Sequence, residues 1–144
     1  NGRLRGRKGG MHEGGHRVPF IASWPGVIGA GLEINDTVMT MDFFPTFVHL
    51  AGAKIPLEHE IDGQDLWPLL SGTDHLPQRT LHWLFGESWA VRHGAWKLMQ
   101  EGDLALFDLE HDPEEKNNLL SRYPDRVATF THLHEEWIAK VGRK

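Results

Sequence analysis

Residues 7–19 read RKGGMHEGGHRVP, and this stretch decides how the start of the chain is expected to fold. It places Lys8 at the mouth of a glycine-rich loop that leads into an apolar run. Glycine adopts positive φ readily and lets the backbone approach a ligand closely. The apolar run, Val18 to Trp24, predicts a buried strand that stops at Pro25-Gly26. A lysine held in such a loop predicts an anion-binding site on the rim of a sheet.

The composition of the chain fits a globular protein. With 144 residues, 40% of them hydrophobic and 24% charged, the chain is large enough for one core. Its formal net charge of −5 disfavours a nucleic-acid partner, although Arg3, Arg5, Arg7 and Lys8 form a local basic patch. The sequence contains no Cys, so neither a disulfide nor thiol chemistry is expected within it. No apolar run is long enough to predict a membrane span or a signal segment.

Two regions of secondary structure are expected. In the first, a helix is predicted from about Met41 to Ala51, with Asp42 near the positive end of its dipole. Pro45 is tolerable there only because it falls in the opening turns. A shorter helix is predicted over Leu66 to Leu70, ending at Ser71-Gly72.

The second region is predicted to be an antiparallel sheet covered by one helix. That helix carries Pro124 in its first turn and runs to about Val141, with an apolar stripe at helical spacing. His93-Gly94 and Gly102-Asp103 are predicted hairpin turns. The predicted strands are Thr80 to Phe85, Ser88 to Arg92, Ala95 to Gln100 and Ala105 to Leu109.

Three other motifs are weaker than the anion-binding loop. Residues 12–16, HEGGH, match the zinc-protease pattern, which requires a helix. Each of the two glycines costs about 1 kcal/mol of helix stability, so no helix is expected there. Residues 2–8 resemble a phosphate loop, but Arg7 separates Gly6 from Lys8, which breaks the pattern. The arginine-rich start lacks the interleaved aromatic side chains of a nucleic-acid-binding surface.

Short motifs that are found together in one protein family occur in order along almost the whole chain. The series begins with Asn1-Gly2, Lys8-Gly9 and EGGHRVP at residues 13–19. It continues with WPG at 24–26, MDFFPT at 41–46, LAG at 50–52, DGQDL at 62–66, PLLSG at 68–72, AVR at 90–92, WKL at 96–98, LFDL at 106–109, DPEE at 112–115 and Asn118-Leu119. Together these motifs resemble the C-terminal part of the sulfatases, sulfuric ester hydrolases of the alkaline-phosphatase-like superfamily.

The resemblance implies an α/β fold class. Residues 1–73 would be the tail end of an alkaline-phosphatase-like α/β catalytic domain. Residues 74–144 would be a C-terminal subdomain, a small antiparallel β-sheet packed with a terminal helix. The Val18 to Trp24 strand would then lack its neighbours in this chain and present an aggregation-prone edge.

The resemblance also implies two site residues. Asn1 matches a family asparagine that binds one calcium ion beside the sulfate ester, and a carboxamide oxygen is a suitable hard ligand for calcium. The remaining calcium ligands are expected outside this chain. Lys8 matches the family lysine that contacts the sulfate oxygens, where its ammonium would stabilise the transition state. Glu13 and Arg17 are interpreted as structural, an ion pair or a backbone clamp that shapes the loop. His12 and His16 could line the entrance of the substrate site, but a supporting or exposed position is favoured for them.

The family nucleophile has no match in this sequence. Sulfatases carry formylglycine, made from the Cys or Ser of a C/S-x-P-x-R motif, and it is expected upstream of this chain. Ser23 comes closest, but Val27 stands where that motif has Arg, and Ser23 falls in the predicted buried strand. The chain alone is therefore predicted to be inactive.

Two alternatives remain open from the sequence. One is a phosphodiesterase or phosphonate hydrolase of the same superfamily. The other is a non-catalytic sulfate- or glycan-binding module, with Trp83, Trp89 and Trp96 as stacking platforms if they are exposed on one sheet face. The expected partner is a sulfate-ester small molecule or a sulfated glycan, and family resemblance alone implies an exported or lysosomal parent protein.

Overall fold

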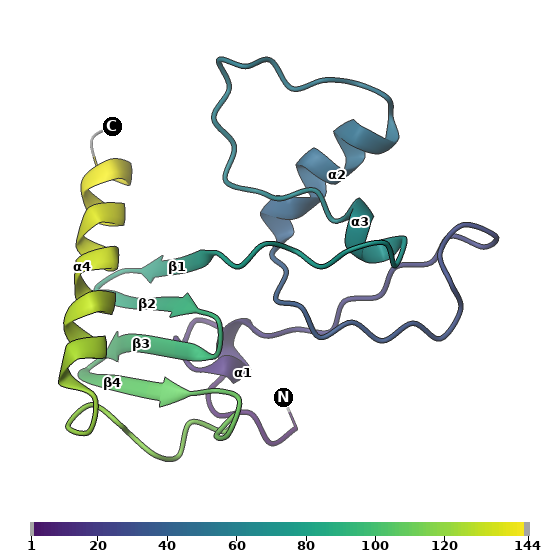
Figure 1. Ribbon diagram of the computed structural model, residues 1–144. Helices are drawn as coiled ribbons and strands as arrows, with labels where there is room; N and C mark the ends of the chain where they lie inside the picture. The colour runs from purple at the N-terminus through teal and green to yellow at the C-terminus, as the bar shows by residue number, and fades with distance from the viewer. Residues whose placement is uncertain (1, 143–144) are drawn as a thin grey trace. The chain divides into compact units, whose positions relative to one another are not determined.

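The computed structural model describes residues 2–142 of the chain (Figure 1). Its contacts divide the chain into two units, one comprising the chain up to Pro19 together with Gln78 onward, the other Phe20–Pro77. The elements are α1 (Glu13–His16), the 3₁₀ turn η1 (Thr40–Asp42), α2 (Phe43–Leu50), α3 (Trp67–Leu70), β1 (Thr80–Phe85), β2 (Ser88–His93), β3 (Trp96–Glu101), β4 (Asp103–Asp108) and α4 (Pro124–Val141). Within residues 2–142, none of these helices has the length and apolar character that crossing a membrane requires.

The first unit is built on an antiparallel sheet with the strand order β1-β2-β3-β4. Each strand pairs with the next along the chain, as in the registers Val91↔Leu98 and Leu98↔Leu106. Gly94 begins the turn between β2 and β3 with a φ of 60°, a conformation that favours glycine. Gly102, with a φ of 80°, lies between β3 and β4, so the predicted turns at His93-Gly94 and Gly102-Asp103 are both confirmed.

One face of the sheet is covered by α4. Successive side chains of a strand point to opposite faces, so Val91, Leu98 and Leu106 lie on the same side of the sheet. They form a buried cluster with Phe130 of α4, whose side chain is 4% exposed. The helix begins at Pro124 and ends at Val141, as predicted, although Val141 itself is 42% exposed.

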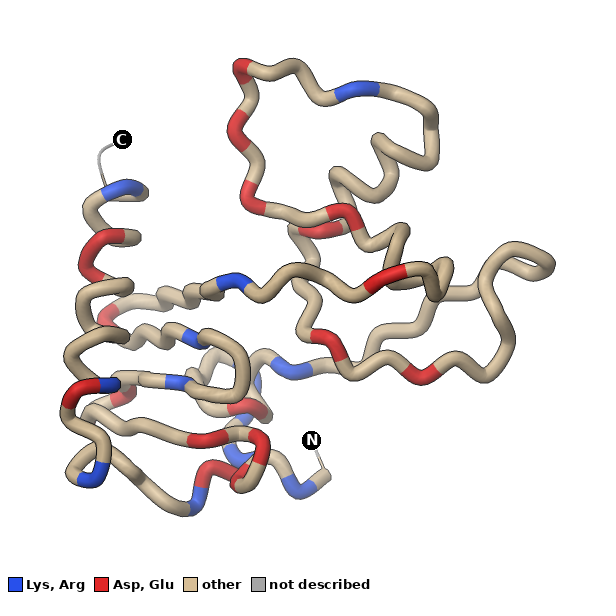
Figure 2. The backbone as a smooth tube through the Cα atoms, viewed as in Figure 1, with Lys and Arg blue, Asp and Glu red and all other residues tan. Residues whose placement is uncertain are grey.

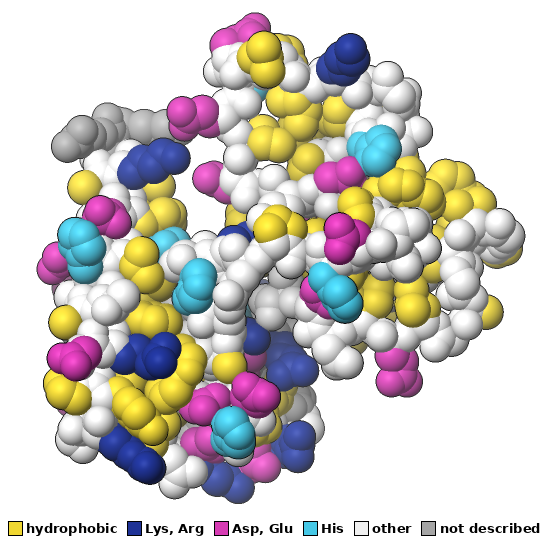
Figure 3. Space-filling view, viewed as in Figure 1, with side chains coloured by type: hydrophobic (Ala, Val, Ile, Leu, Met, Phe, Trp, Pro, Cys, Tyr) yellow, Lys and Arg dark blue, Asp and Glu magenta, His cyan; other side chains and the backbone are white. Residues whose placement is uncertain are grey.

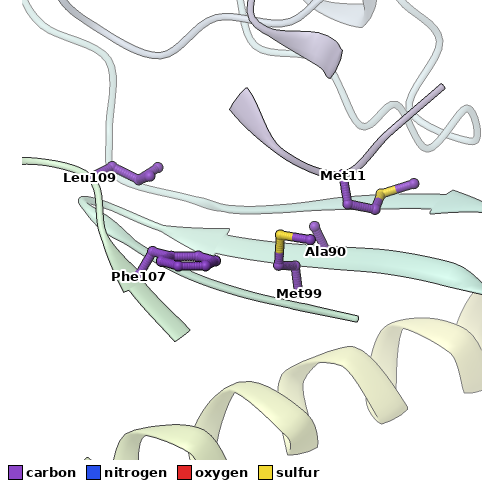
Figure 4. Close-up of a cluster of buried hydrophobic side chains, with 5 residues drawn as sticks. All are labelled: Met11, Ala90, Met99, Phe107 and Leu109. Carbon is purple, nitrogen blue, oxygen red and sulfur yellow. The ribbon is translucent and has the colours of Figure 1, made fainter. Parts of the chain in front are cut away.

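The opposite face is covered by the start of the chain. Met11 lies over Ala90 and Met99 in a second buried cluster that also contains Phe107 and Leu109 (Figure 4). By contacts, therefore, the residues up to Pro19 group with the sheet rather than with Phe20–Pro77. The predicted assignment of residues 1–73 to the catalytic domain of the parent protein stays a prediction.

The second unit contains η1, α2 and α3, close to the predicted helices. Asp42 is fully buried, and its carboxylate accepts the N–H groups of Met39 (2.7 Å) and Gln64 (2.9 Å). A Cβ on Gly63 would collide with the Met41 carbonyl group, so only glycine fits beside this turn. The MDFFPT and DGQDL motifs are thus held together by backbone hydrogen bonds to one buried acid.

The predicted buried strand from Val18 to Trp24 is wrong for this structure. These residues are in neither a helix nor a strand, and the side chains of Val18 and Ile21 are 72% and 88% exposed. A strand requires a neighbour, and within residues 2–142 every strand pairing belongs to β1–β4. Ser23 is consequently exposed rather than buried. Figure 3 shows hydrophobic side chains gathered on the surface of the part that holds α2 and α3.

Candidate functional site

Lys8 lies in a tight turn. The N–H of Gly10 donates to the carbonyl oxygen of Arg7 at 2.9 Å, and Gly9 has a φ of 89°. A turn with this hydrogen bond and a positive φ at its third residue is of type II, which explains the glycine after Lys8. The Lys8 side chain is exposed, and within residues 2–142 no hydrogen bond or ion pair joins it to another residue. Its ammonium is thus available to an anion.

A buried charge cluster lies beside this turn, where the start of the chain meets β3. Lys97 is fully buried, and its Nζ donates to Glu13 Oε1 at 3.0 Å and to Glu115 Oε1 at 2.8 Å. Arg92 of β2 places its Nη1 3.5 Å from Glu13 Oε2. Two carboxylates therefore oppose two cationic side chains, and the cluster is neutral overall. Figure 2 shows Lys and Arg positions on β2, on β3 and along the start of the chain.

Glu115 joins this cluster to the backbone of α1. Its Oε2 accepts the N–H of Glu13 at 2.6 Å, which satisfies a donor at the start of the helical turn. Its own carbonyl oxygen accepts a hydrogen bond from Arg5 Nη1 at 3.0 Å. Glu115 has a φ of 55°, a left-handed conformation that costs a non-glycine residue about 1–2 kcal/mol. The contacts of the carboxylate and carbonyl groups offset that cost.

The charges of the cluster shift the pKa values of its members. Burial raises the pKa of the Glu13 carboxyl, but the charge and hydrogen bond of Lys97 lower it by more, so the pKa lies below its ordinary value. Burial and the charge of Lys97 both lower the pKa of His16. The His16 ring is therefore neutral at pH 7, and its Nε2 lies 3.1 Å from Lys97 Nζ, where it can accept a hydrogen bond.

The glycines of the EGGH stretch are required by close backbone packing. A Cβ on Gly14 would lie 2.5 Å from the carbonyl oxygen of Arg5, and one on Gly15 would collide with the Gly10 carbonyl group. The N–H of Gly14 donates to that Arg5 oxygen at 2.7 Å. Backbone contact of this kind fixes the loop around Lys8.

The predicted site residues have different outcomes. Lys8 lies in an exposed turn, and its contact with sulfate stays a prediction. Asn1, the predicted calcium ligand, lies outside the described residues. The structural interpretation of Glu13 is confirmed, but its ion-pair partners are Lys97 and Arg92. The side chain of Arg17 is exposed, and its N–H donates to the Glu13 carbonyl oxygen at 2.8 Å, which makes it part of a backbone clamp.

The expectation that HEGGH forms no helix is wrong, since Glu13–His16 make one helical turn. Tertiary hydrogen bonds, among them the one from Glu13 N–H to Glu115, override the poor helix propensity of the glycines. The zinc-protease arrangement is nevertheless absent from the described part of the chain. Glu13 is turned into the charge cluster, His16 stacks on Trp83 at 4.4 Å, and His12 Nδ1 lies 3.3 Å from Glu115 Oε2.

The three tryptophans proposed as a stacking surface lie on two faces of the sheet. Trp83 packs on the Met11 side, against the buried cluster of Ala90 and Met99. Trp89 and Trp96 pack on the α4 side, where Trp89 stacks on His134 at 4.0 Å. All three are half-buried, so they do not form one exposed platform.

Lys97, Arg92 and Glu115 were not singled out from the sequence, although they belong to noted motifs. The signal for Lys97 was its position: in the strand WKLMQ it alternates with Trp96 and Leu98 and shares a face with Met99. A lysine on the inward face of an apolar strand indicates a buried partner of opposite charge. No local pattern indicated Glu115.

Comparison with known proteins gives a consistent result. The family model described as N-sulphoglucosamine sulphohydrolase, C-terminal, matches residues 7–141. Arylsulfatase A from Bos taurus is 35% identical over 158 residues, covering 89% of this chain and 31% of that protein. Steryl-sulfatase from Rattus norvegicus is 51% identical over 72 residues, covering 50% of this chain and 12% of that protein.

Solved structures agree with these sequence matches. The crystal structure of Ps i-CgsB has a TM-score of 0.88 to this chain at 28% identity, covering 95% of this chain and 32% of that one. A structure of Ps i-CgsB in complex with k-i-k-neocarrahexaose gives a TM-score of 0.87. This chain therefore spans at most 32% of the length of any of these relatives.

Proposed function

We propose that the parent protein of this chain hydrolyses sulfate esters. The premise is that the chain belongs to the N-sulphoglucosamine sulphohydrolase C-terminal family and is a C-terminal portion of a sulfatase. The observation that carries the proposal is the Lys8 turn. It presents an exposed ammonium on a backbone that is fixed by hydrogen bonds on both sides. A fixed cation is suited to a sulfate group, whose oxygens carry the charge that shifts as the ester bond breaks.

Lys8 would act by hydrogen bonding to the sulfate oxygens. An ammonium is a compact point charge with three donors, and it needs no particular orientation of the sulfate group. A charge-assisted hydrogen bond of this kind contributes about 1.5–3 kcal/mol. The proposed formylglycine, upstream of this chain, would supply the nucleophile. Without it, the chain by itself is expected to show no turnover.

The proposed calcium ion would be held by Asn1 together with ligands outside this chain. Calcium takes oxygen ligands only, and the Asn1 carboxamide offers one. Within residues 2–142, the side chains that bring three potential ligand atoms together are Asp108, Glu110 and His111. That set, in which Asp108 is half-buried and the other two side chains are exposed, includes an imidazole, which suits transition metals better than calcium. This group of side chains therefore does not match the oxygen ligands that the proposed calcium ion requires.

The substrate is proposed to be a sulfate-ester small molecule or a sulfated glycan. The glycan class is favoured because the structural relative Ps i-CgsB has been solved with an oligosaccharide, k-i-k-neocarrahexaose.

The test is the hydrolysis of an aryl sulfate by the parent protein. Replacing Lys8 by Ala should lower kcat/KM about 10- to 150-fold, which corresponds to one lost charge-assisted hydrogen bond. The matched control is Lys116→Ala, since Lys116 is an exposed lysine whose ammonium lies 2.6 Å from Glu114 Oε2, and its loss should leave turnover unchanged. Faster turnover of a phosphodiester than of the sulfate would instead favour the phosphodiesterase alternative.

A further inference from the structure

Three segments that are distant in the sequence meet at the Lys97 ammonium. Glu13 precedes Lys97 by 84 residues, and Glu115 follows it by 18. The exposed fractions of the three side chains are 0% for Lys97, 1% for Glu13 and 0% for Glu115. The start of the chain, β3 and the loop after β4 are thus joined through one buried nitrogen atom.

Burial of charge is a costly way to join segments. Removing ions from water costs several kcal/mol for each ion, and an apolar cluster in the same place is often as stable or more stable. An apolar contact is already present on this face, where Met11 packs against Ala90 and Met99. What the charges add is a requirement for proximity, because a buried carboxylate that moves away from the Lys97 ammonium is left without its counter-charge, which costs several kcal/mol.

Hydrogen bonds hold the chain on both sides of Lys8, to the cluster before it and to the end of β3 after it. Before it, Arg5 donates to the Glu115 carbonyl oxygen at 3.0 Å and accepts the Gly14 N–H at 2.7 Å. After it, the N–H of Met11 donates to Glu101 Oε2 at the end of β3, at 3.0 Å. Only the type II turn lies between these anchored residues. A displacement of Glu115 or of β3 would therefore move Lys8.

We propose that Lys97, acting through Glu13 and Glu115, positions Lys8 for the sulfate group. The C-terminal sheet is then a working part of the catalytic site rather than a separate scaffold. We assign Lys97, Glu13 and Glu115 as positioning residues, since all three are fully buried. The inference rests on the proposed role of Lys8, and the experiment separates the failure of one from the failure of the other.

The experiment is a double-mutant cycle in the parent protein, read as kcat/KM for an aryl sulfate per folded molecule. Lys97→Met should lower kcat/KM about tenfold when Lys8 is present and less than about twofold in the Lys8→Ala background, because coupled residues are not additive. A purely structural Lys97 would give equal losses in both backgrounds, which would overturn the inference. If Lys8→Ala alone has no effect, the proposed function fails instead.

A second pair of variants covers the outcome in which Lys97→Met does not fold. Glu101 is exposed, so its replacement leaves the buried cluster intact. Glu101→Ala removes the acceptor of the Met11 N–H and should lower kcat/KM about three- to tenfold, whereas Glu101→Gln keeps an oxygen acceptor and should restore most of it. Equal activity of these two variants would overturn the inference that the hydrogen bond from Met11 to Glu101 helps to position Lys8. Lys116→Met, which lies outside the cluster, should match the unchanged protein.

Discussion

One face of the four-stranded sheet packs apolar and aromatic side chains against α4, whereas the other holds a loop through buried charges. On the α4 face, Phe130 contributes to a cluster with Leu98 and Leu106. On the other face, Lys97 binds Glu13 and Glu115 next to a smaller apolar cluster around Met11. Both side chains, Leu98 and Lys97, come from adjacent positions of β3 and are fully buried.

The apolar contacts of one face and the ion cluster of the other have different physical properties. Apolar burial is proportional to area and has no direction, so it stabilises α4 on the sheet without requiring one exact arrangement. An ion cluster is weak evidence for stability, but leaving one of its buried members without a counter-charge costs about 3–5 kcal/mol. A loop that must present Lys8 at one place gains from the second kind of contact, and a covering helix needs only the first.

The largest change in stability is expected at neighbouring residues of β3, where one side chain from each face of the sheet can be replaced. Lys97→Met leaves two buried carboxylates without their common partner and should lower the free energy of unfolding by about 3–5 kcal/mol. Leu98→Met, on the α4 face, conserves volume and should cost less than about 1.5 kcal/mol. Urea denaturation of both variants measures the difference. Equal losses would mean that the charges are no more demanding than the apolar contacts.

A smaller effect is expected from the backbone packing around the loop. Gly14→Ala would place a Cβ 2.5 Å from the Arg5 carbonyl oxygen, and we expect a loss of about 1–3 kcal/mol from overpacking. Gly29 provides the control, because a Cβ there meets nothing within 4 Å, and Gly29→Ala should change stability by about 0.5 kcal/mol or less. The melting temperatures of the two variants test this, and a silent Gly14→Ala would contradict the packing argument.

Acid should affect the buried histidines before the buried carboxylate of Glu13. Burial and the charge of His134 lower the pKa of His82 on the α4 face from 6.5 to about 4. The folded state therefore binds fewer protons than the unfolded state in this range, so stability is full above pH 6.5 and falls toward pH 4. The pKa of Glu13 is lowered from 4.5, so its contribution is lost only at lower pH. The contributions of the buried histidines, His82 on the α4 face and His16 on the opposite face, should therefore be lost before that of Glu13.

His82→Phe tests this order, because Phe keeps the stacking on Trp137, at 4.8 Å in the present structure, and cannot be protonated. The unfolding free energy of this variant should change less between about pH 7.5 and about pH 5 than that of the unchanged protein. Lys97→Met should also reduce the pH dependence in that range, because, besides burial, the charge of Lys97 is one cause of the lowered pKa of His16. An identical slope in His82→Phe would assign the acid sensitivity elsewhere.

Local sequence patterns were enough to predict most of the helices and strands. The bounds of β1 and α4 match their predictions, because alternation over Thr80–Phe85 and helical spacing over Pro124–Val141 are properties of the segments themselves. The predicted fold class, the C-terminal part of a sulfatase α/β architecture, is confirmed by the family match and by the structural similarity to Ps i-CgsB. The α4 face could therefore be largely predicted.

Contacts between distant segments could not be predicted in the same way. The strand expected over Val18 to Trp24 was inferred from hydrophobicity, but a strand also requires a neighbour, and none pairs with it among residues 2–142. The link from Glu13 to Lys97 crosses 84 residues and has no periodic signature. The glycines predicted the loop at Lys8, whereas no local pattern predicted the residues that anchor this loop.

The left-handed backbone of Glu115 has a consequence for how the chain folds. By itself, the loop after β4 would avoid a φ of 55° at a glutamate, and by itself the glycine-rich start of the chain would not form a helical turn. Each becomes favourable only when the other supplies its hydrogen-bonding partner, as in the bond from Glu13 N–H to Glu115 Oε2. The two segments should consequently acquire order in a single step, late, after β3 has placed Lys97 between them.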